Sequence, residues 1–138
     1  PLRHRLQLVG NYDEVTYYDN SIATIPKATI EAVKALSNVD TLIIGGMDRG
    51  IDYTELIEFI NRSEMNHIIC MPKTGHDIAS QIEKKTYLVN TMEEVVVTAK
   101  QVTTKGKSCL LSPAAASYGF FKNFEEKGDI YQELVKKI

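Results

Sequence analysis

Short apolar runs alternate with segments of helical periodicity along most of this chain. The runs cover residues 41–44, 67–70, 86–89 and 108–111. Strands that are apolar without a break are typical of a parallel sheet whose two faces are both covered by helices. The alternation therefore predicts an α/β domain of Rossmann-like, three-layer architecture, with a mainly parallel sheet between two layers of helices.

The N-terminal residues predict a different arrangement. Residues 5–9 and 15–18 are both strand-like, and Gly10, Asn11 and Asp13 lie between them. Glycine, asparagine and aspartate favour turns, so we expect an antiparallel hairpin at the N-terminus. Together with the four apolar runs, this hairpin predicts a sheet of about six strands.

Each expected helix has an apolar stripe and a start signal in the sequence. The start signals are Pro26, Gly75 for a short helix, and the pairs Asp52/Glu55, Thr91/Glu94 and Asp129/Gln132. Proline fits a first helical turn because its missing N–H would be unpaired there, and each pair has the spacing of a capping box. We therefore expect the fourth helix to end near Val102 and the last helix to be capped by Asp129.

Composition limits the kinds of function that this chain can have. Its 138 residues suit one domain, 43% of them are apolar, and the net charge is −2. No basic field favours nucleic acid or anionic lipid, and no apolar run reaches the roughly 18 residues of a membrane span. Residues 1–10 contain no apolar leader stretch, and no Cys/His spacing suggests a metal site. Cys70 and Cys109 lie in apolar runs, so we expect buried free thiols, a reducing compartment and a cytoplasmic location.

Three loops are candidates for a ligand-binding site. In open parallel sheets, ligands bind beyond the carboxyl ends of the strands. The loops that follow or approach those ends cover residues 17–26, 45–50 and 112–128. We expect the site where these three loops meet.

The first two loops carry hydroxyl groups and one cation. Ser21 and Thr24 lie between a strand end and a helix, where they can cap that helix or contact a ligand. Gly45 and Gly46 allow a sharp backbone turn after a buried strand, and Arg49 follows near the tip. Arg49 is either a solvated side chain at an ordinary turn or a planar fork that clamps a carboxylate or phosphate.

The third loop combines small residues with aromatic ones. The run SPAAAS, residues 112–117, lets chain segments pack closely beside a ligand and ends in the hydroxyl of Ser117. Free N–H groups of a helical turn between Ser117 and Phe124 would face an anion at that end. The aromatic residues Phe120, Phe121 and Phe124 also have a simpler interpretation as core. No GxxxxGK[ST] phosphate loop occurs in the chain.

Four segments together resemble the C-terminal domain of the Mur ligases. The segments are PLRHR, DNSIATIPKATIEAVKAL, GGMDRG and LLSPAAASYGFFKNFEEKGD. They span nearly the whole chain in the right order, and the last of them is the most specific. Within the family, the resemblance is nearest to the branch that adds D-glutamate to UDP-N-acetylmuramoyl-L-alanine in peptidoglycan synthesis.

The resemblance implies an activity that this chain shares with two further domains. In the family, ATP phosphorylates a substrate carboxylate, and the amine of the incoming amino acid attacks the acyl phosphate. An N-terminal domain binds the UDP-sugar, and a central domain holds ATP and Mg²⁺. The C-terminal domain binds the amino acid and closes over the nucleotide. Residues 1–138 are then one domain of a longer ligase, inactive alone and holding neither ATP nor Mg²⁺ by itself.

The resemblance also implies roles for residues of all three loops. Thr24 and Arg49 match the positions that hold one carboxylate of D-glutamate. Ser117 and Phe124 match the positions that hold the other carboxylate, Phe124 through its backbone N–H. None of these residues is implied to act as a catalytic group or as a metal ligand.

The nucleotide contacts are where the chain departs from the family pattern. Arg5 matches an arginine that reaches the nucleotide phosphates, and Asn20 matches an acidic position that contacts the ribose. Here the acidic residue is displaced to Asp19, a lysine is replaced by Ile22, and a lysine in the second loop is replaced by Arg49. Either the ribose contact is weaker, or Asp19 makes it.

Two other functions remain open at this point. The chain can be the equivalent domain of another Mur-type or folylpolyglutamate-type amide ligase. It can also be a non-catalytic, metabolite-binding domain that uses the same fold.

Overall fold

The computed structural model describes residues 2–138, which form six strands and five helices. The strands are β1 (Gln7–Tyr12), β2 (Val15–Asp19), β3 (Val39–Ile44), β4 (His67–Cys70), β5 (Lys85–Leu88) and β6 (Ser108–Leu111). The helices are α1 (Pro26–Ala35), α2 (Thr54–Arg62), α3 (Thr74–Ile78), α4 (Met92–Val102) and α5 (Phe124–Lys137). A 3₁₀ turn, Ala79–Gln81, follows α3.

The six strands form one mixed sheet in the order β1-β2-β6-β3-β4-β5. Only the hairpin of β1 and β2 is antiparallel, and the other neighbours are parallel. The expected mainly parallel sheet with an N-terminal hairpin is therefore confirmed. Because β6 lies between β2 and β3, the last strand of the chain is in the middle of the sheet.

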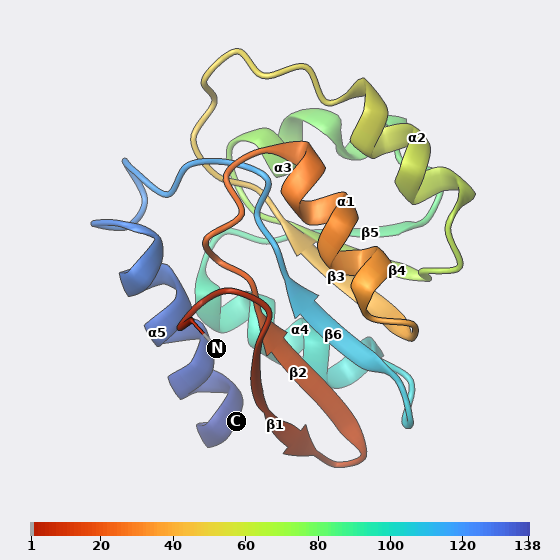
Figure 1. The fold of residues 1–138 in the computed structure, drawn as a ribbon, viewed down its shortest axis with the longest axis vertical. Helices are drawn as coiled ribbons and strands as arrows, with labels where there is room; N and C mark the ends of the chain where they lie inside the picture. Colours follow the sequence, from red (N-terminus) through yellow and green to blue (C-terminus); the bar gives the residue numbers. More distant parts are fainter. Residues whose placement is uncertain (1) are drawn as a thin grey trace.

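Helices cover both faces of the sheet, as expected for a three-layer domain (Figure 1). All six residues of β3 are buried, and successive side chains point to opposite faces. Leu42 and Ile44 belong to a core cluster with α1, α2 and α3, whereas Ile43 belongs to a second cluster with α4 and α5. Burial on both faces explains why the strand has no polar alternation.

The hairpin turn lies further along the chain than expected. Tyr12 pairs with Val15, so the turn consists of Asp13 and Glu14, with φ values of 52° and 67°. A two-residue hairpin turn requires positive φ at both central residues, which aspartate tolerates better than most. Gly10 lies inside β1, at a point where the pairing register with β2 shifts.

The last helix starts earlier than the expected cap at Asp129. It begins at Phe124, and the side chain of Asn123 accepts a hydrogen bond from the N–H of Glu126 at 2.8 Å. Asp129 lies in the second turn, where its carboxylate forms an exposed ion pair with Arg3. The expectation was wrong because Asn123 and Glu126 have the same start-signal spacing as the pair that begins at Asp129.

Of three other expected helix starts, two are confirmed and one was wrong. The capping box of Thr91 and Glu94 is confirmed, with both reciprocal hydrogen bonds present. The box expected at Asp52 was wrong, because its carboxylate accepts from the N–H of Thr54 and not from Glu55. Pro26 occupies the first turn of α1 as expected.

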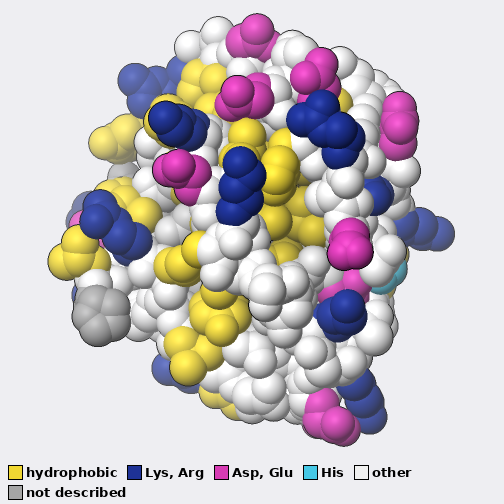
Figure 2. Space-filling view, turned by 45° about the vertical axis from the view of Figure 1, so that its right-hand side comes forward, with side chains coloured by type: hydrophobic (Ala, Val, Ile, Leu, Met, Phe, Trp, Pro, Cys, Tyr) yellow, Lys and Arg dark blue, Asp and Glu magenta, His cyan; other side chains and the backbone are white. Residues whose placement is uncertain are grey.

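The surface carries charges of both signs. Figure 2 shows basic and acidic side chains interspersed around a strip of apolar ones. A groove between α1 and α2 is lined by charged side chains of both signs, which are Lys27, Glu31, Lys34, Glu55 and Arg62. None of the helices in the described part of the chain could span a bilayer.

The two cysteines are free and buried, as expected. Cys70 packs in the cluster under α1 to α3, and Cys109 packs in the cluster under α4 and α5. Burial raises the pKa of each thiol to about 12, so neither is a reactive thiolate near neutral pH.

Candidate functional site

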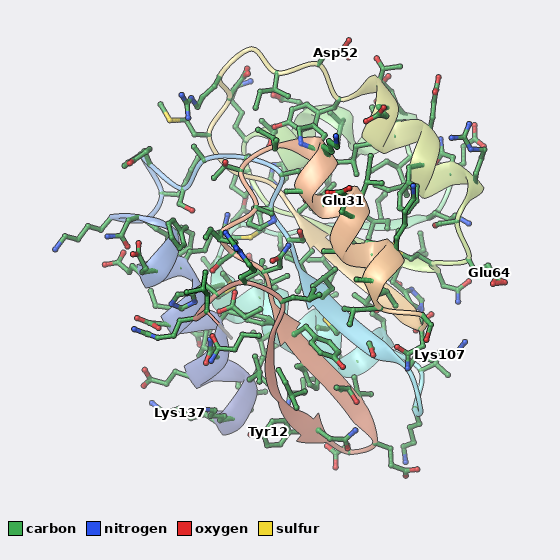
Figure 3. All side chains as sticks on the ribbon, in the orientation of Figure 1. Tyr12, Glu31, Asp52, Glu64, Lys107 and Lys137 are labelled. Atoms are coloured by element: carbon green, nitrogen blue, oxygen red, sulfur yellow. The ribbon has the colours of Figure 1, made fainter. Side chains whose placement is uncertain are left out.

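The strand order brings the three expected loops to one end of the sheet. Strands β2, β6 and β3 are neighbours, so the loops that follow them leave the sheet side by side. Figure 1 shows these loops, coloured orange, blue and yellow, together at the carboxyl ends of the strands. In Figure 3, Asp52 lies at the loop end of the molecule, and Tyr12 lies at the opposite end.

The third loop is bonded directly to the first. The N–H of Asn20 donates to the carbonyl of Leu111 at 2.7 Å, and the N–H of Ala114 donates to the carbonyl of Ala23 at 3.0 Å. The residues before α1 are therefore fixed against the loop that follows β6.

The third loop is also bonded to the second. The N–H of Gly45 donates to the carbonyl of Pro113 at 2.9 Å, and the N–H of Met47 donates to the carbonyl of Ala116 at 2.8 Å. Gly45 has a φ of 121°, and a Cβ atom there would overlap the carbonyl of Met71. Only glycine allows the second loop to turn this closely beside its neighbours.

A pocket of about 230 Å³ lies where the three loops meet. Its lining includes all four residues that the family resemblance assigned to the amino acid. The lining residues are Thr24, Arg49, Ala116, Ser117, Tyr118, Asn123, Phe124 and Glu125. Residues that are up to 101 positions apart in the sequence, Thr24 and Glu125, thus face one cavity.

Ser117 contributes a buried hydroxyl to this pocket. The residue is 3% exposed, and its Oγ atom has no hydrogen-bond partner among residues 2–138. Buried hydroxyls in folded proteins are almost always paired. An unpaired one that lines a cavity is available to a ligand.

Phe124 places the start of α5 at the same pocket. Asn123 caps the N–H of Glu126, but within the described residues no acceptor contacts the N–H groups of Phe124 and Glu125. Free N–H groups at the start of a helix favour an anion, through hydrogen bonds and the helix dipole. The corrected helix start therefore strengthens the expectation for an anion site here.

Arg49 and Thr24 face the pocket from the other two loops. Arg49 is exposed at the loop tip, and no carboxylate of residues 2–138 lies within ion-pair distance of it. The alternative that Ser21 or Thr24 caps α1 was wrong, because Ile25 is the cap residue and receives no side-chain bond.

The aromatic residues of the third loop have different environments. Phe121 packs partly against the second core cluster, which fits the core interpretation. Phe120 is 48% exposed and Tyr118 is 60% exposed, so the core interpretation fails for Phe120. Phe124 is half-buried, with its ring 6.1 Å from that of His4.

Sequence reasoning missed three residues around the pocket. Asn123 and Glu125 line it, and Lys127 is buried in the first turn of α5 and donates to the carbonyl of Gly45 in the second loop. The spacing of Asn123 and Glu126 was the available signal for the first two, because it marks the helix start. No sequence signal distinguishes Lys127 from the many exposed lysines of this chain.

The two residues expected at the nucleotide lie in a separate groove. Arg5 and Asn20 line a cavity of about 360 Å³ beside Leu6, Ile22 and alanines of α1. Asn20 is 5% exposed, and its amide oxygen accepts from the N–H of Leu6 while its amide nitrogen donates to Ser112. Asp19 is fully buried.

The carboxylate of Asp19 has three internal partners. One oxygen lies 2.7 Å from Nδ1 of His4 and accepts from the amide of Gln132, and the other accepts from the N–H of Ser21. Asp19 therefore offers no exposed oxygen to a ligand, and the network instead fastens the N-terminal segment to α5.

The residues around Arg5 could contact a nucleotide at its phosphates but could not enclose it. The exposed guanidinium of Arg5 suits a phosphate contact, but most of the side chains around it are apolar. No cluster of three histidine, cysteine or carboxylate side chains that could hold a metal ion occurs among residues 2–138. These residues do not fit a magnesium ion, and they do not fit a triphosphate held by this domain alone.

Comparison with known proteins gives one family match and several relatives. The model of the family described as coenzyme F430 synthetase CfbE, C-terminal domain, matches residues 11–113. The UDP-N-acetylmuramoylalanine--D-glutamate ligase of Caldanaerobacter subterraneus subsp. tengcongensis is 35% identical over 99% of this chain. The UDP-N-acetylmuramoyl-L-alanine--L-glutamate ligase of Salinispora tropica is 34% identical over 98% of it.

The chain spans about a third of these relatives, 32% of the first and 31% of the second. The solved bifunctional folylpolyglutamate synthase/dihydrofolate synthase of Yersinia pestis CO92 has the same fold, with a TM-score of 0.70 and 14% identity. That similarity covers 97% of this chain and 31% of the solved one. Because the family model covers most of the chain and the relatives align along all of it, the chain belongs to the Mur ligase family as a C-terminal domain.

Proposed function

We propose that this chain is the amino-acid-binding domain of an ATP-dependent ligase that adds D-glutamate to UDP-N-acetylmuramoyl-L-alanine in peptidoglycan synthesis. One observation carries the proposal: Thr24, Arg49, Ser117 and Phe124, from three separate loops, line a single pocket. The relative from Caldanaerobacter supports D-glutamate as the amino acid.

The pocket contains the groups that a dicarboxylic amino acid needs. Arg49 and Thr24 would bind one carboxylate, and the Ser117 hydroxyl with the Phe124 N–H would bind the other. Hydrogen bonds to charged groups contribute about 1.5–3 kcal/mol each. A volume of about 230 Å³ suits an amino acid, since pockets for drug-sized ligands start at roughly 300 Å³.

The remaining substrates would be held mainly by two preceding domains of the whole protein. ATP supplies the activation of the acceptor carboxylate, with Mg²⁺, and Arg5 and Asn20 would contact the nucleotide when the domains close. This domain positions the amino acid and helps to exclude water. We expect the isolated chain to be inactive and the whole protein to be cytoplasmic, where ATP and UDP-sugars occur.

A ligase of the same type with another substrate is the second candidate. The relative from Salinispora is named for L-glutamate, and the matching family model is named for coenzyme F430 synthetase. Two carboxylate contacts do not fix the handedness of an amino acid, because its ammonium group must also be placed. The pocket residues therefore favour glutamate without choosing between its enantiomers.

The test is an assay of the whole protein with ATP, Mg²⁺ and UDP-N-acetylmuramoyl-L-alanine. D-glutamate and L-glutamate are supplied separately, and the product is followed by mass spectrometry together with ADP release. The proposal expects an amide product with D-glutamate. A clear preference for L-glutamate would support the second candidate, and no product with either enantiomer would overturn the assignment of this acceptor.

A further inference from the structure

Lys127 is buried, and no carboxylate of residues 2–138 lies within ion-pair distance of its Nζ atom. The residue is 1% exposed, and burial lowers the pKa of its ammonium to about 7. It lies in the first turns of α5, where the positive end of the helix dipole disfavours a cation. Removing a cation from water without a counter-charge opposes folding, so stability alone does not explain a lysine here.

The ammonium of Lys127 is bonded to the turn of the second loop. Its Nζ atom donates to the carbonyl of Gly45 at 2.7 Å and lies 5.5 Å from the centre of the Phe121 ring. Gly45 is the first residue after β3, and its N–H donates to the carbonyl of Pro113. Lys127 therefore joins α5 to the point where the second and third loops are bonded together.

Backbone hydrogen bonds connect this point to both halves of the pocket. Two residues after Gly45, the N–H of Met47 donates to the carbonyl of Ala116. Arg49 lies two residues beyond Met47, and Ser117 directly follows Ala116. A turn at Gly45 that is free to shift would change the distance between the guanidinium of Arg49 and the hydroxyl of Ser117.

We infer that Lys127 is a positioning residue of the amino-acid pocket, which holds the Gly45 turn against α5 and so fixes Arg49 relative to Ser117. The inference rests on the proposed function, because it assumes that these two residues bind the amino acid. Lys127 does not line the pocket, so it acts through the backbone of Gly45 and not on the substrate.

The experiment compares Lys127→Met and Lys127→Arg in the whole ligase. Methionine keeps a flexible chain of similar length without the donor, and arginine keeps an N–H donor for the carbonyl of Gly45. We expect Lys127→Met to raise the KM for glutamate about tenfold with little change in the KM for ATP, and Lys127→Arg to restore most of the loss. The amides of Gly45 and Met47 should exchange hydrogen faster in Lys127→Met than in the wild type or in Lys127→Arg.

Lys100→Met is the matched control. Lys100 also donates to a backbone carbonyl, that of Val135 at 2.9 Å, but it lies on α4. It should leave the exchange of the Gly45 turn and the KM for glutamate unchanged.

The possible outcomes separate a failure of the inference on Lys127 from a failure of the proposed function. Unchanged exchange at Gly45 and Met47 in Lys127→Met would overturn the inference, whatever the kinetics. Faster exchange with an unchanged KM for glutamate would show that the turn does not position the pocket, and would overturn it as well. A wild-type ligase that accepts no glutamate would overturn the proposed function, while the exchange rates would still decide whether Lys127 holds the turn.

Discussion

The hydroxyl of Ser117 faces the pocket and not another side chain of the fold. It is buried, and its Oγ atom has no partner among the described residues. Buried hydroxyls without a protein partner are rare in folded proteins, and such exceptions concentrate at functional sites. Within residues 2–138 the hydroxyl of Ser21 is also unpaired but does not line this pocket, so it is the position of Ser117 on the cavity that makes its hydroxyl available to a carboxylate.

Ser117→Ala should therefore weaken amino-acid binding without weakening the fold. We expect the KM for glutamate of the whole ligase to rise at least tenfold, because a hydrogen bond to a charged group is lost, while the KM for ATP stays constant. Thermal unfolding should not shift downwards. Ser112→Ala is the control, because that hydroxyl bonds Thr29 and Asn20 and its loss should lower stability by about 1 kcal/mol. An unchanged KM for glutamate in Ser117→Ala would remove Ser117 from the site.

Lys127 should make the stability of this domain depend on pH. Burial lowers the pKa of Lys127 from 10.5 to about 7 in the folded state. Between these two pH values the unfolded chain holds a proton that the folded chain has released, so the free energy of unfolding rises with pH. The contribution is complete above pH 10.5 and is lost as the pH falls through 7.

Denaturant unfolding of residues 1–138 measures this effect. Between pH 7 and pH 9 we expect the wild type to gain about 2 kcal/mol relative to Lys127→Met. Parallel pH profiles for the two proteins would show instead that the ammonium keeps its ordinary pKa, through its bond to Gly45 and the face of Phe121.

At the scale of elements, α5 connects the fold to the site. Its first turn lines the pocket, its second turn packs through Gly128 against the His4 and Asp19 pair, and its N-terminus is fixed by one side-chain cap. An N-cap residue determines where the first free N–H groups of a helix lie. Asn123 therefore sets the position of the Phe124 N–H.

Replacing the cap gives a direct comparison between the observed and the expected helix start. Asn123→Ala should lower the free energy of unfolding by about 1 kcal/mol, because the N–H of Glu126 loses its partner. Asp129→Ala should lower it by less, since its carboxylate caps no N–H group and contributes an exposed ion pair with Arg3 and a 3.3 Å contact with Nε2 of His4. Denaturant unfolding of both variants decides the matter, and a larger loss for Asp129→Ala would place the helix start where the sequence pattern suggested.

Helix and strand types could be predicted from the sequence better than their boundaries. The buried strands were evident because both of their faces are covered. Their side chains therefore form short apolar runs that are bounded by turn-forming residues. The hairpin turn and the start of α5 were misplaced because several turn formers or cap pairs compete within a few residues. Only packing against the rest of the fold selects Asp13 and Asn123 among them.

At the scale of the whole molecule, the sheet order determines where the site can be. The insertion of β6 between β2 and β3 could not be predicted from the sequence, because apolar runs do not specify their neighbours. The meeting of the three loops could be predicted, because every parallel strand ends at the same edge. The contact of Lys127 with Gly45 could not be predicted, since it depends on how α5 packs against the loop that follows β3.

The central claim is that one pocket at this edge binds the amino acid of a ligase. The most direct measurement is the KM for glutamate and for ATP in whole ligases that carry Arg49→Ala or Arg62→Ala. Arg62 is the control, because it is an exposed arginine of α2 in the groove beside α1. We predict that Arg49→Ala raises the KM for glutamate about 10- to 100-fold, with the KM for ATP unchanged, and that Arg62→Ala changes neither. An unchanged KM for glutamate in Arg49→Ala, or a rise in the KM for ATP alone, would contradict the account.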